Sequence, residues 1–184
     1  ATPQWLAEHG LPERYLLFVG SLEPRKNLVT LLKAHARARA ENPDVPTLVL
    51  VGPPGWGEAV ERQDSVVSTG YLPHEQLRRL VAGAVALTLP SRYEGFGLPL
   101  LEAFACGTRV VAGRVPDLQE VSAGLAPIVD PDDVDGIAQA IVTVSTSDPG
   151  EAEARKARAR QFTWSRCAEA TMGAYHQAVG TLVP

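Results

Sequence analysis

The sequence predicts an α/β fold with a doubly wound parallel sheet of about six strands and additional helices at the C-terminal end. Short runs rich in leucine or β-branched residues alternate with longer segments of helical period, the pattern of repeated strand–helix units. The strand runs are almost continuously apolar, as expected for parallel strands that helices cover on both faces. A length of 184 residues, with 45% hydrophobic and 21% charged residues, is ordinary for one compact domain with a substantial core.

In chain order, the apolar runs predict strands at residues 15–20, 47–52, 66–71, 85–90, 109–112 and 126–130. The segments between them predict helices at residues 28–42, 74–84, 99–106, 118–123 and 134–144. Two more helical stretches, about 151–161 and 165–183, follow the last strand without a further strand to pair with. We expect them to pack on the outside of the domain or against another partner.

The last helical stretch carries an apolar stripe. Met172, Tyr175, Val179 and Leu182 recur at spacings of three and four, so this face requires a partner surface. Core packing within the domain is the simplest explanation of the stripe.

Charge excludes one class of function. The net charge is −4 and no dense basic stripe occurs, which argues against a nucleic-acid partner. A local basic cluster at residues 155–160 follows Glu151 and Glu153, and we interpret it as a solvated helical face with spaced ion pairs.

No apolar run approaches the roughly 20 residues that span a bilayer. The first ten residues include Trp5, Glu8 and His9 and lack the basic-then-apolar profile of a secretory signal, so we expect a cytoplasmic protein. Cys106 and Cys167 have no CxxC or Cys/His ligand spacing, which favours buried or half-buried free thiols.

Candidate site residues follow the predicted strands, because ligands of open α/β sheets bind outside the carboxyl ends of the strands. Four such loops contain glycine or charged residues: GSLEPRKN from residue 20, GPPGWG from residue 52, GYLP from residue 70 and PSRYEGFG from residue 90. The carboxyl rim of the sheet is therefore the predicted site.

The loop EGFGLPLLE, residues 94–102, joins a buried strand to a helix that Pro99 helps to start. Gly95 and Gly97 allow a close backbone approach to a ligand, and we expect free N–H groups at Gly97, Leu98 and Leu100 to suit a phosphate. A structural glycine turn followed by an amphipathic helix is the alternative, with Leu98, Leu101 and Phe104 in a core.

Together, PSRYEGFGLPLLEAFACGT resembles the donor-site signature of glycosyltransferase family 4, which contains retaining enzymes of the GT-B fold. The segments LPERYLLFVGSLEPRKNL, LVGPPGWG, TGYLPHEQL and the late FTW extend the resemblance over the chain. It implies a Rossmann-like domain that forms the donor-binding half of a GT-B enzyme. GSLEPRKN and PSRYEGFGLP look most like mannosyltransferase members, which implies GDP-mannose as donor.

The resemblance also implies individual roles. Glu94 would lie beside the transferred sugar, Glu102 would bind the ribose hydroxyls, and the amides around Phe96, Gly97 and Leu98 would hold the diphosphate and sugar. The two carboxylates, one in the loop and one inside the helix, would then meet different parts of one elongated ligand.

Positive charge at the same rim comes from Arg25 and Lys26, which follow the first strand. Fixed cations stabilise the charge that develops on a departing diphosphate, by about 3 kcal/mol or more for a well-placed donor. Many relatives place an arginine directly after the glycine that ends the first strand, and here Ser21 follows Gly20. Arg25 compensates for this difference or is a surface residue.

For the nucleotide base, the resemblance points to backbone near residues 52–53 and to Gly70, Tyr71 and Leu72. Tyr71 and Trp56 are candidates to stack on a ring, or they are local packing anchors. His74 is expected to begin a helix rather than to catalyse.

We expect neither a metal nor a cofactor, because no cluster of histidines and carboxylates stands at ligand spacing. Asp132 and Asp133 are interpreted as acidic residues at a helix start. Lys33 and Arg37 are interpreted as solvated helix faces.

The resemblance implies three segments: a linker from a missing N-terminal domain (residues 1–14), the nucleotide-sugar-binding domain (15–162) and a C-terminal helix (163–184). The missing domain would bind the acceptor, so the chain should bind donor without turnover and leave part of the last helix exposed. A lipid acceptor would imply peripheral membrane association of the full enzyme. A nucleotide-sugar 2-epimerase-like domain and a non-catalytic nucleotide-sugar-binding module are the alternatives.

Overall fold

The computed structural model describes residues 2–53 and 64–180, and within them six strands form one parallel sheet. The strands are β1 (Tyr15–Val19), β2 (Thr47–Val51), β3 (Val66–Gly70), β4 (Ala86–Leu89), β5 (Arg109–Gly113) and β6 (Ile128–Val129). Their order is β3-β2-β1-β4-β5-β6, with all neighbours parallel. The predicted class is confirmed. The sixth strand is shorter than predicted, because only Ile128 and Val129 pair with β5.

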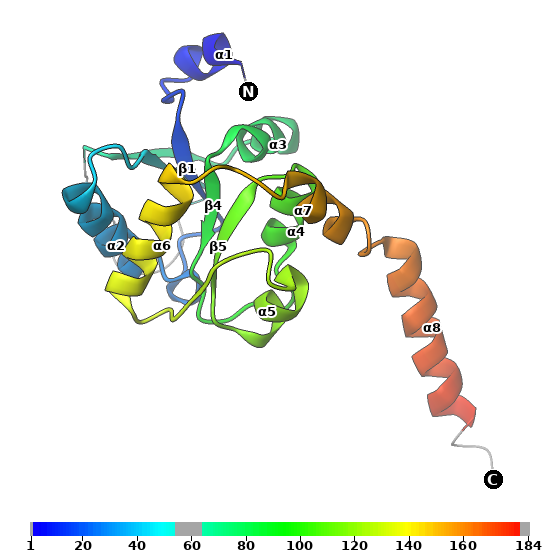
Figure 1. Cartoon of the computed structure of the whole chain (residues 1–184). Helices are drawn as coiled ribbons and strands as arrows, with labels where there is room; N and C mark the ends of the chain where they lie inside the picture. Colours follow the sequence, from blue (N-terminus) through cyan, green and yellow to red (C-terminus); the bar gives the residue numbers. More distant parts are fainter. Residues whose placement is uncertain (1, 54–63, 181–184) are drawn as a thin grey trace.

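Helices cover both faces of the sheet (Figure 1). The α-helices from Leu28 onward are α2 (Leu28–Glu41), α3 (His74–Gly83), α4 (Leu98–Ala105), α5 (Pro116–Ser122), α6 (Val134–Thr146), α7 (Ala152–Ala159) and α8 (Trp164–Gly180). α2 and α6 lie on one face, α3, α4 and α5 lie on the other, and α7 packs along α4. Each predicted helix is present, and His74 begins one of them as expected.

The core is split into two layers by the sheet, and β1 shows why its sequence is apolar throughout. Tyr15 and Leu17 point into the layer under α3, α4 and α5, whereas Leu16 and Phe18 point into the layer under α2 and α6. All four side chains are fully buried. A parallel strand with helices on both faces has no solvent-facing side, and so no polar alternation appears in its sequence.

Residues 3–8 form a helix, α1 (Pro3–Glu8), that the sequence analysis did not predict. The hydroxyl of Thr2 accepts a hydrogen bond from the N–H of Trp5 and caps this helix. Leu6 and Leu11 are buried against the same core layer as Tyr15. Part of the segment interpreted as a linker therefore packs on the domain.

The prediction that the basic cluster on α7 is a solvated face is wrong in part. The expected ion pairs exist between Lys156 and Glu153 and between Arg160 and Glu153. Arg155, in contrast, is buried, and its guanidinium donates to the carbonyl oxygens of Gly107, Pro149 and Gly150. A guanidinium has five donors in a fixed fork, so it can join several carbonyls at a loop crossing.

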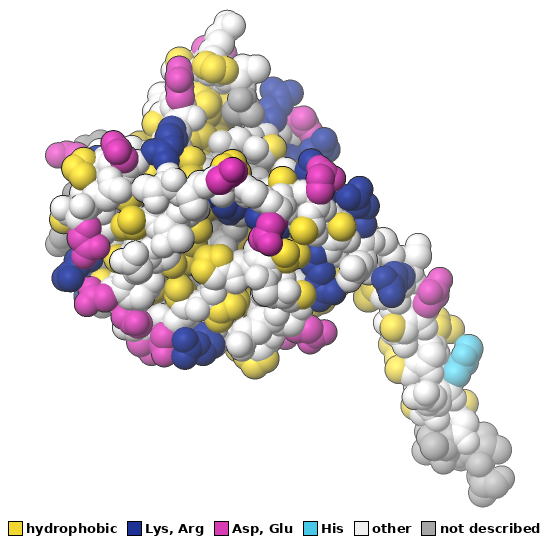
Figure 2. All heavy atoms as spheres, viewed as in Figure 1, with side chains coloured by type: hydrophobic (Ala, Val, Ile, Leu, Met, Phe, Trp, Pro, Cys, Tyr) yellow, Lys and Arg dark blue, Asp and Glu magenta, His cyan; other side chains and the backbone are white. Residues whose placement is uncertain are grey.

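The interpretation of the apolar stripe on α8 as core packing is wrong, whereas the expectation that part of the last helix is exposed is confirmed. Helix α8 projects from the body of the domain (Figure 1). Its Met172, Tyr175 and Val179 side chains are exposed. Figure 2 shows hydrophobic side chains on the surface of this helix. Leu182 lies outside the described residues. Cys167 is also exposed, contrary to the expectation for both thiols, whereas Cys106 is half-buried. No helix in residues 2–53 and 64–180 is long and apolar enough to cross a membrane.

Candidate functional site

The site lies where the strand order reverses, between β1 and β4 at the centre of the sheet. The connection after β1 leads outward to β2, and the connection after β4 leads the opposite way to β5, so a crevice opens between the two loops. The loop at residues 20–27 follows β1, and the loop at residues 90–97 follows β4. Both are loops that the sequence predicted at the carboxyl rim.

Asn27 holds these two loops together. Its backbone is left-handed, at φ 61°, which asparagine tolerates better than most residues. Its amide Nδ2 donates to the carbonyl of Pro90 at 3.0 Å and to that of Pro131 at 2.6 Å. The N–H of Arg92 also donates to the carbonyl of Arg25 at 2.9 Å. The charged residues beside Asn27 are thereby brought against the β4 loop.

The centre of the site is a buried ion pair. Lys26 Nζ lies 2.7 Å from Glu94 Oε1, and the two side chains are only 7% and 6% exposed. The hydroxyl of Ser91 donates to the same carboxylate oxygen at 2.6 Å. Two donors on one oxygen offset the cost of burying this carboxylate. A lysine ammonium has three donors, and one of those of Lys26 is used by Glu94.

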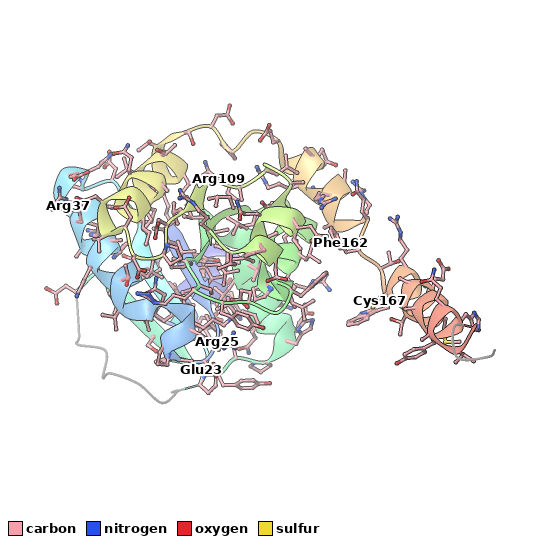
Figure 3. The ribbon with its side chains drawn as sticks, turned by 90° about the horizontal axis from the view of Figure 1, so that it is seen from below. Glu23, Arg25, Arg37, Arg109, Phe162 and Cys167 are labelled. Atoms are coloured by element: carbon pink, nitrogen blue, oxygen red, sulfur yellow. The ribbon has the colours of Figure 1, made fainter. Side chains whose placement is uncertain are left out.

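Arg25 extends the cluster toward solvent. Its Nη1 lies 3.7 Å from Glu94 Oε2. Its Nε lies 2.8 Å from Glu23 Oε2, and Figure 3 labels both Arg25 and Glu23. Ser21 donates to the other oxygen of Glu23 at 2.6 Å. The hydrogen bonds from Ser21 and Arg25 hold the pKa of Glu23 below its usual range. Arg25 is 44% exposed and also contacts Glu94, so both alternatives for Arg25 stay open.

The glycine loop enters α4 through Gly97, whose φ of 90° is unfavourable for any side chain. A Cβ atom at this position would lie 2.5 Å from Cδ2 of Leu118 on α5. Glycine is thus required twice, once by the backbone and once by the close packing of α5. α4 then begins at Leu98, in the same loop-to-helix segment that carries Glu94.

The free amides of this loop differ in part from the prediction. The N–H of Leu100 is not free, because it donates to the carbonyl of Gly97 at 2.9 Å. Within the described part of the chain, the N–H groups of residues 95–98 have no hydrogen-bond acceptor. Leu98 is 52% exposed rather than in the core. The unpaired amides at the positive end of α4 suit an anion.

Glu102 lies apart from the ion-pair cluster. It is an exposed residue in the second turn of α4, and desolvation by its neighbours raises its pKa, which the charge of His74 opposes. The structure therefore brings Arg25, Lys26 and Glu94 together and places Glu102 on the side of α3. The separation agrees with the expectation that the two glutamates would meet different parts of a ligand.

The loops after β2 and β3 line the same rim. The N–H of Gly20 donates to Val51, and the N–H of Gly52 donates to Gly70, each at 2.9 Å, so the backbones at these strand ends are paired with one another. Tyr71 is 75% exposed, which removes the interpretation of its ring as a packing anchor. Leu72 is half-buried against the core. Trp56, the other stacking candidate, lies outside the described residues.

Sequence reasoning missed three residues of this site: Asn27, Glu23 and Ser91. Asparagine directly after the basic pair is a signal for the left-handed turn. Ser91 stands three residues before Glu94, a spacing that allows a local hydrogen bond. Glu23 gave no signal, because an acidic residue in a loop is usually solvated.

One other feature of the described residues could have held a ligand. A cavity of about 330 Å³ lies at the amino ends of β4 and β5, on the rim opposite the site, and Arg109 and Arg155 line it. Both guanidiniums are bonded to loop carbonyls and join loops in this structure.

Among residues 2–53 and 64–180, no group of three or more His, Cys, Asp or Glu side chains could hold a metal ion. Asp133 instead caps α6 by accepting from the N–H of Gly136, as predicted for a helix start.

Known proteins resemble this chain along most of its length. The profile of the family Glycosyl transferases group 1 matches residues 13–147. O-antigen chain mannosyltransferase B of Escherichia coli is 39% identical over 173 residues, which cover 88% of this chain and 45% of that protein. D-inositol 3-phosphate glycosyltransferase of Mycolicibacterium smegmatis is 34% identical over 191 residues, covering 94% of this chain and 43% of that protein.

A solved structure also resembles this chain over nearly its whole length. Sucrose-phosphate synthase from Thermosynechococcus elongatus has a TM-score of 0.74 and 28% identity, over 98% of this chain and 49% of that one. The chain spans about half the length of the relatives it matches.

Proposed function

The chain belongs to the family Glycosyl transferases group 1, and from that premise we propose that it is the donor-binding half of a retaining family 4 glycosyltransferase. In this proposal the complete enzyme transfers a hexose, mannose from GDP-mannose, to an acceptor. The single observation that carries the proposal is the buried Lys26–Glu94 pair, whose Glu94 directly precedes residues 95–98, the N–H groups of which have no acceptor among the described residues. A cation, a carboxylate and a helix start then meet at one crevice, as a diphosphate sugar requires.

The proposed chemistry breaks the bond between the anomeric carbon and the oxygen of the diphosphate. The electron pair of that bond goes to the diphosphate, where Lys26, Arg25 and the loop amides stabilise the added charge. The acceptor oxygen bonds to the same face of the sugar, and its proton passes to the departing phosphate oxygen. Glu94 would lie beside the sugar, and its buried bond to Lys26 would keep the ammonium aimed at the phosphates.

The remaining partners belong to the same proposal. Fixed cations of the chain replace a metal ion, so donor binding needs no divalent cation. The acceptor site comes from the other half of the enzyme, and this chain alone binds donor without transferring sugar. A lipid acceptor would bring the complete cytoplasmic enzyme to a membrane surface.

Thermal shift with GDP, UDP, ADP and TDP and their common sugars tests the proposal. A ligand at 100 times its dissociation constant stabilises the folded state by about 2.7 kcal/mol, so the preferred nucleotide should stand out. Absence of a shift with every nucleotide would contradict donor binding. Sugar transfer by this chain alone to an added acceptor would contradict the division into halves.

Calorimetry with the preferred nucleotide tests Lys26 itself. Lys26→Ala should weaken binding by about 1.5–3 kcal/mol, the range for hydrogen bonds to charged groups. Lys33→Ala is the matched control, because Lys33 is an exposed lysine on α2. Equal affinity of wild type and Lys26→Ala would remove Lys26 from the donor site.

A further inference from the structure

Phe96, the aromatic residue of the glycine loop, contacts a second phenylalanine from the far end of the chain. The rings of Phe96 and Phe162 lie edge to face, with centroids 5.8 Å apart and an interplanar angle of 74°. Phe162 comes from the short connection between α7 and α8, at the point where the chain leaves the body of the domain (Figure 3). It is half-buried and packs against the core, whereas Phe96 is 43% exposed. The exposed ring of Phe96 in the glycine loop therefore packs against the more buried ring of Phe162.

Arg158 also contacts the ring of Phe162. Its Cζ lies 4.7 Å from the centroid of Phe162, a cation–π contact. The same guanidinium donates from Nε to the carbonyl of Val121 at 3.0 Å and from Nη2 to that of Glu120 at 2.7 Å. Arg158 therefore ties Phe162 to the last turn of α5.

The glycine loop is supported at two points that both depend on α5. Leu118 of α5 packs directly behind Gly97, at the start of α4. The last turn of α5 acts on Phe96 through Arg158 and Phe162. Two supports restrict the rotation of the short segment that carries the unpaired N–H groups of residues 95–98.

We propose that Phe162 is a positioning residue for donor binding: its ring holds the glycine loop so that the amides of residues 95–98 face the diphosphate and sugar. That the loop binds a diphosphate sugar rests on the proposed function. That Phe162 holds the loop rests on the geometry alone. α8 begins at Trp164, directly after this contact, so a movement of α8 would reach the donor loop through Phe162.

The test compares Phe162→Leu with Phe162→Tyr and Trp164→Ala in the full chain. Leucine removes the ring and keeps most of the apolar volume, and tyrosine restores the ring. Trp164→Ala is the matched control, because Trp164 is an aromatic residue of the same junction that is 82% exposed. The first readout needs no ligand: hydrogen exchange of the Leu100 and Leu101 amides, which both donate to the carbonyl of Gly97. The second readout is calorimetry with GDP-mannose and with GMP, which lacks the second phosphate and the mannose.

Phe162→Leu should speed exchange at Leu100 and Leu101 and weaken GDP-mannose binding about two- to tenfold, the factor that corresponds to one edge-to-face aromatic pair. GMP affinity should stay unchanged, and Phe162→Tyr and Trp164→Ala should match wild type. In a Phe96→Leu background, Phe162→Leu should cause no further loss. Phe96→Leu also tests the pair from its exposed side if Phe162→Leu does not fold, and it should then loosen the same two amides.

Unchanged exchange in both leucine variants would overturn the proposal. An equal loss of affinity for GMP and GDP-mannose would also overturn it, because that result indicates general destabilisation. If the wild-type chain binds neither ligand, GDP-mannose is not its donor, and the exchange rates alone decide whether Phe162 holds the loop.

Discussion

The substitution Lys26→Met tests the buried ion pair at the centre of the site. It removes the ammonium that lies 2.7 Å from Glu94 and leaves a carboxylate whose side chain is only 6% exposed. Removing one partner of a buried pair costs about 3–5 kcal/mol, because the remaining charge is uncompensated. Ser91 still donates to that carboxylate and Arg25 stands 3.7 Å from it, so we expect the lower end of the range, about 3 kcal/mol.

Urea denaturation of five chains measures this loss in the free energy of unfolding. Wild type, Lys26→Met, Glu94→Gln and the double variant form a cycle, with Lys33→Met as an exposed lysine control expected within about 0.5 kcal/mol of wild type. The double variant has no buried charge at positions 26 and 94, so Glu94→Gln should recover about 2 kcal/mol of the stability that Lys26→Met loses. In a domain of this size the single variant should melt about 6–12 °C below wild type.

Two results of this cycle would contradict the reasoning about the buried pair. If Lys26→Met costs less than about 1 kcal/mol, or if Glu94→Gln brings no recovery in its background, the pair does not carry the buried charge that the site requires.

Three further predictions follow from other residues. The Nε2 of His35 bonds a carbonyl, its buried Nδ1 has no partner in the described residues, and burial lowers its pKa from 6.5. The unfolded chain takes up this proton more readily, so stability should be full above about pH 6.5 and should fall below it in melting curves, and His35→Phe should reduce the fall. Gly97→Ala combines a left-handed backbone with the 2.5 Å approach to Leu118 and should lower the free energy of unfolding in urea by about 2–5 kcal/mol. Cys167 is exposed, whereas Cys106 is half-buried with a raised pKa, so a thiol reagent should modify Cys167 first, and Cys167→Ser should abolish the fast phase.

The strands show which parts of the fold were predictable. β1 is apolar at every position because helices cover both of its faces, and such a run is readable from the sequence alone. β6 was predicted too long, because the length of a strand is set by its partner, and only two residues reach β5. Local pattern predicts that an element exists, whereas pairing decides where it ends.

The helices after the sheet were harder to predict. The charges on α7 suggested a solvated face, yet Arg155 is buried because α7 brings it against loop carbonyls at residues 107, 149 and 150. The stripe on α8 suggested core packing, yet the described part of the helix projects from the body and buries none of its residues. Helical period identifies an apolar face, but not what that face will meet.

The sequence by itself determined the fold class, the family resemblance and the loops that carry the charged residues. These properties are encoded locally, in runs of apolar residues and in glycines and prolines at strand ends. Only the tertiary structure decided that Lys26 and Glu94, 68 residues apart, form one buried pair while Glu102 stands aside. That decision depends on β1 lying next to β4 and on Asn27 joining their loops, long-range contacts that no local pattern contains.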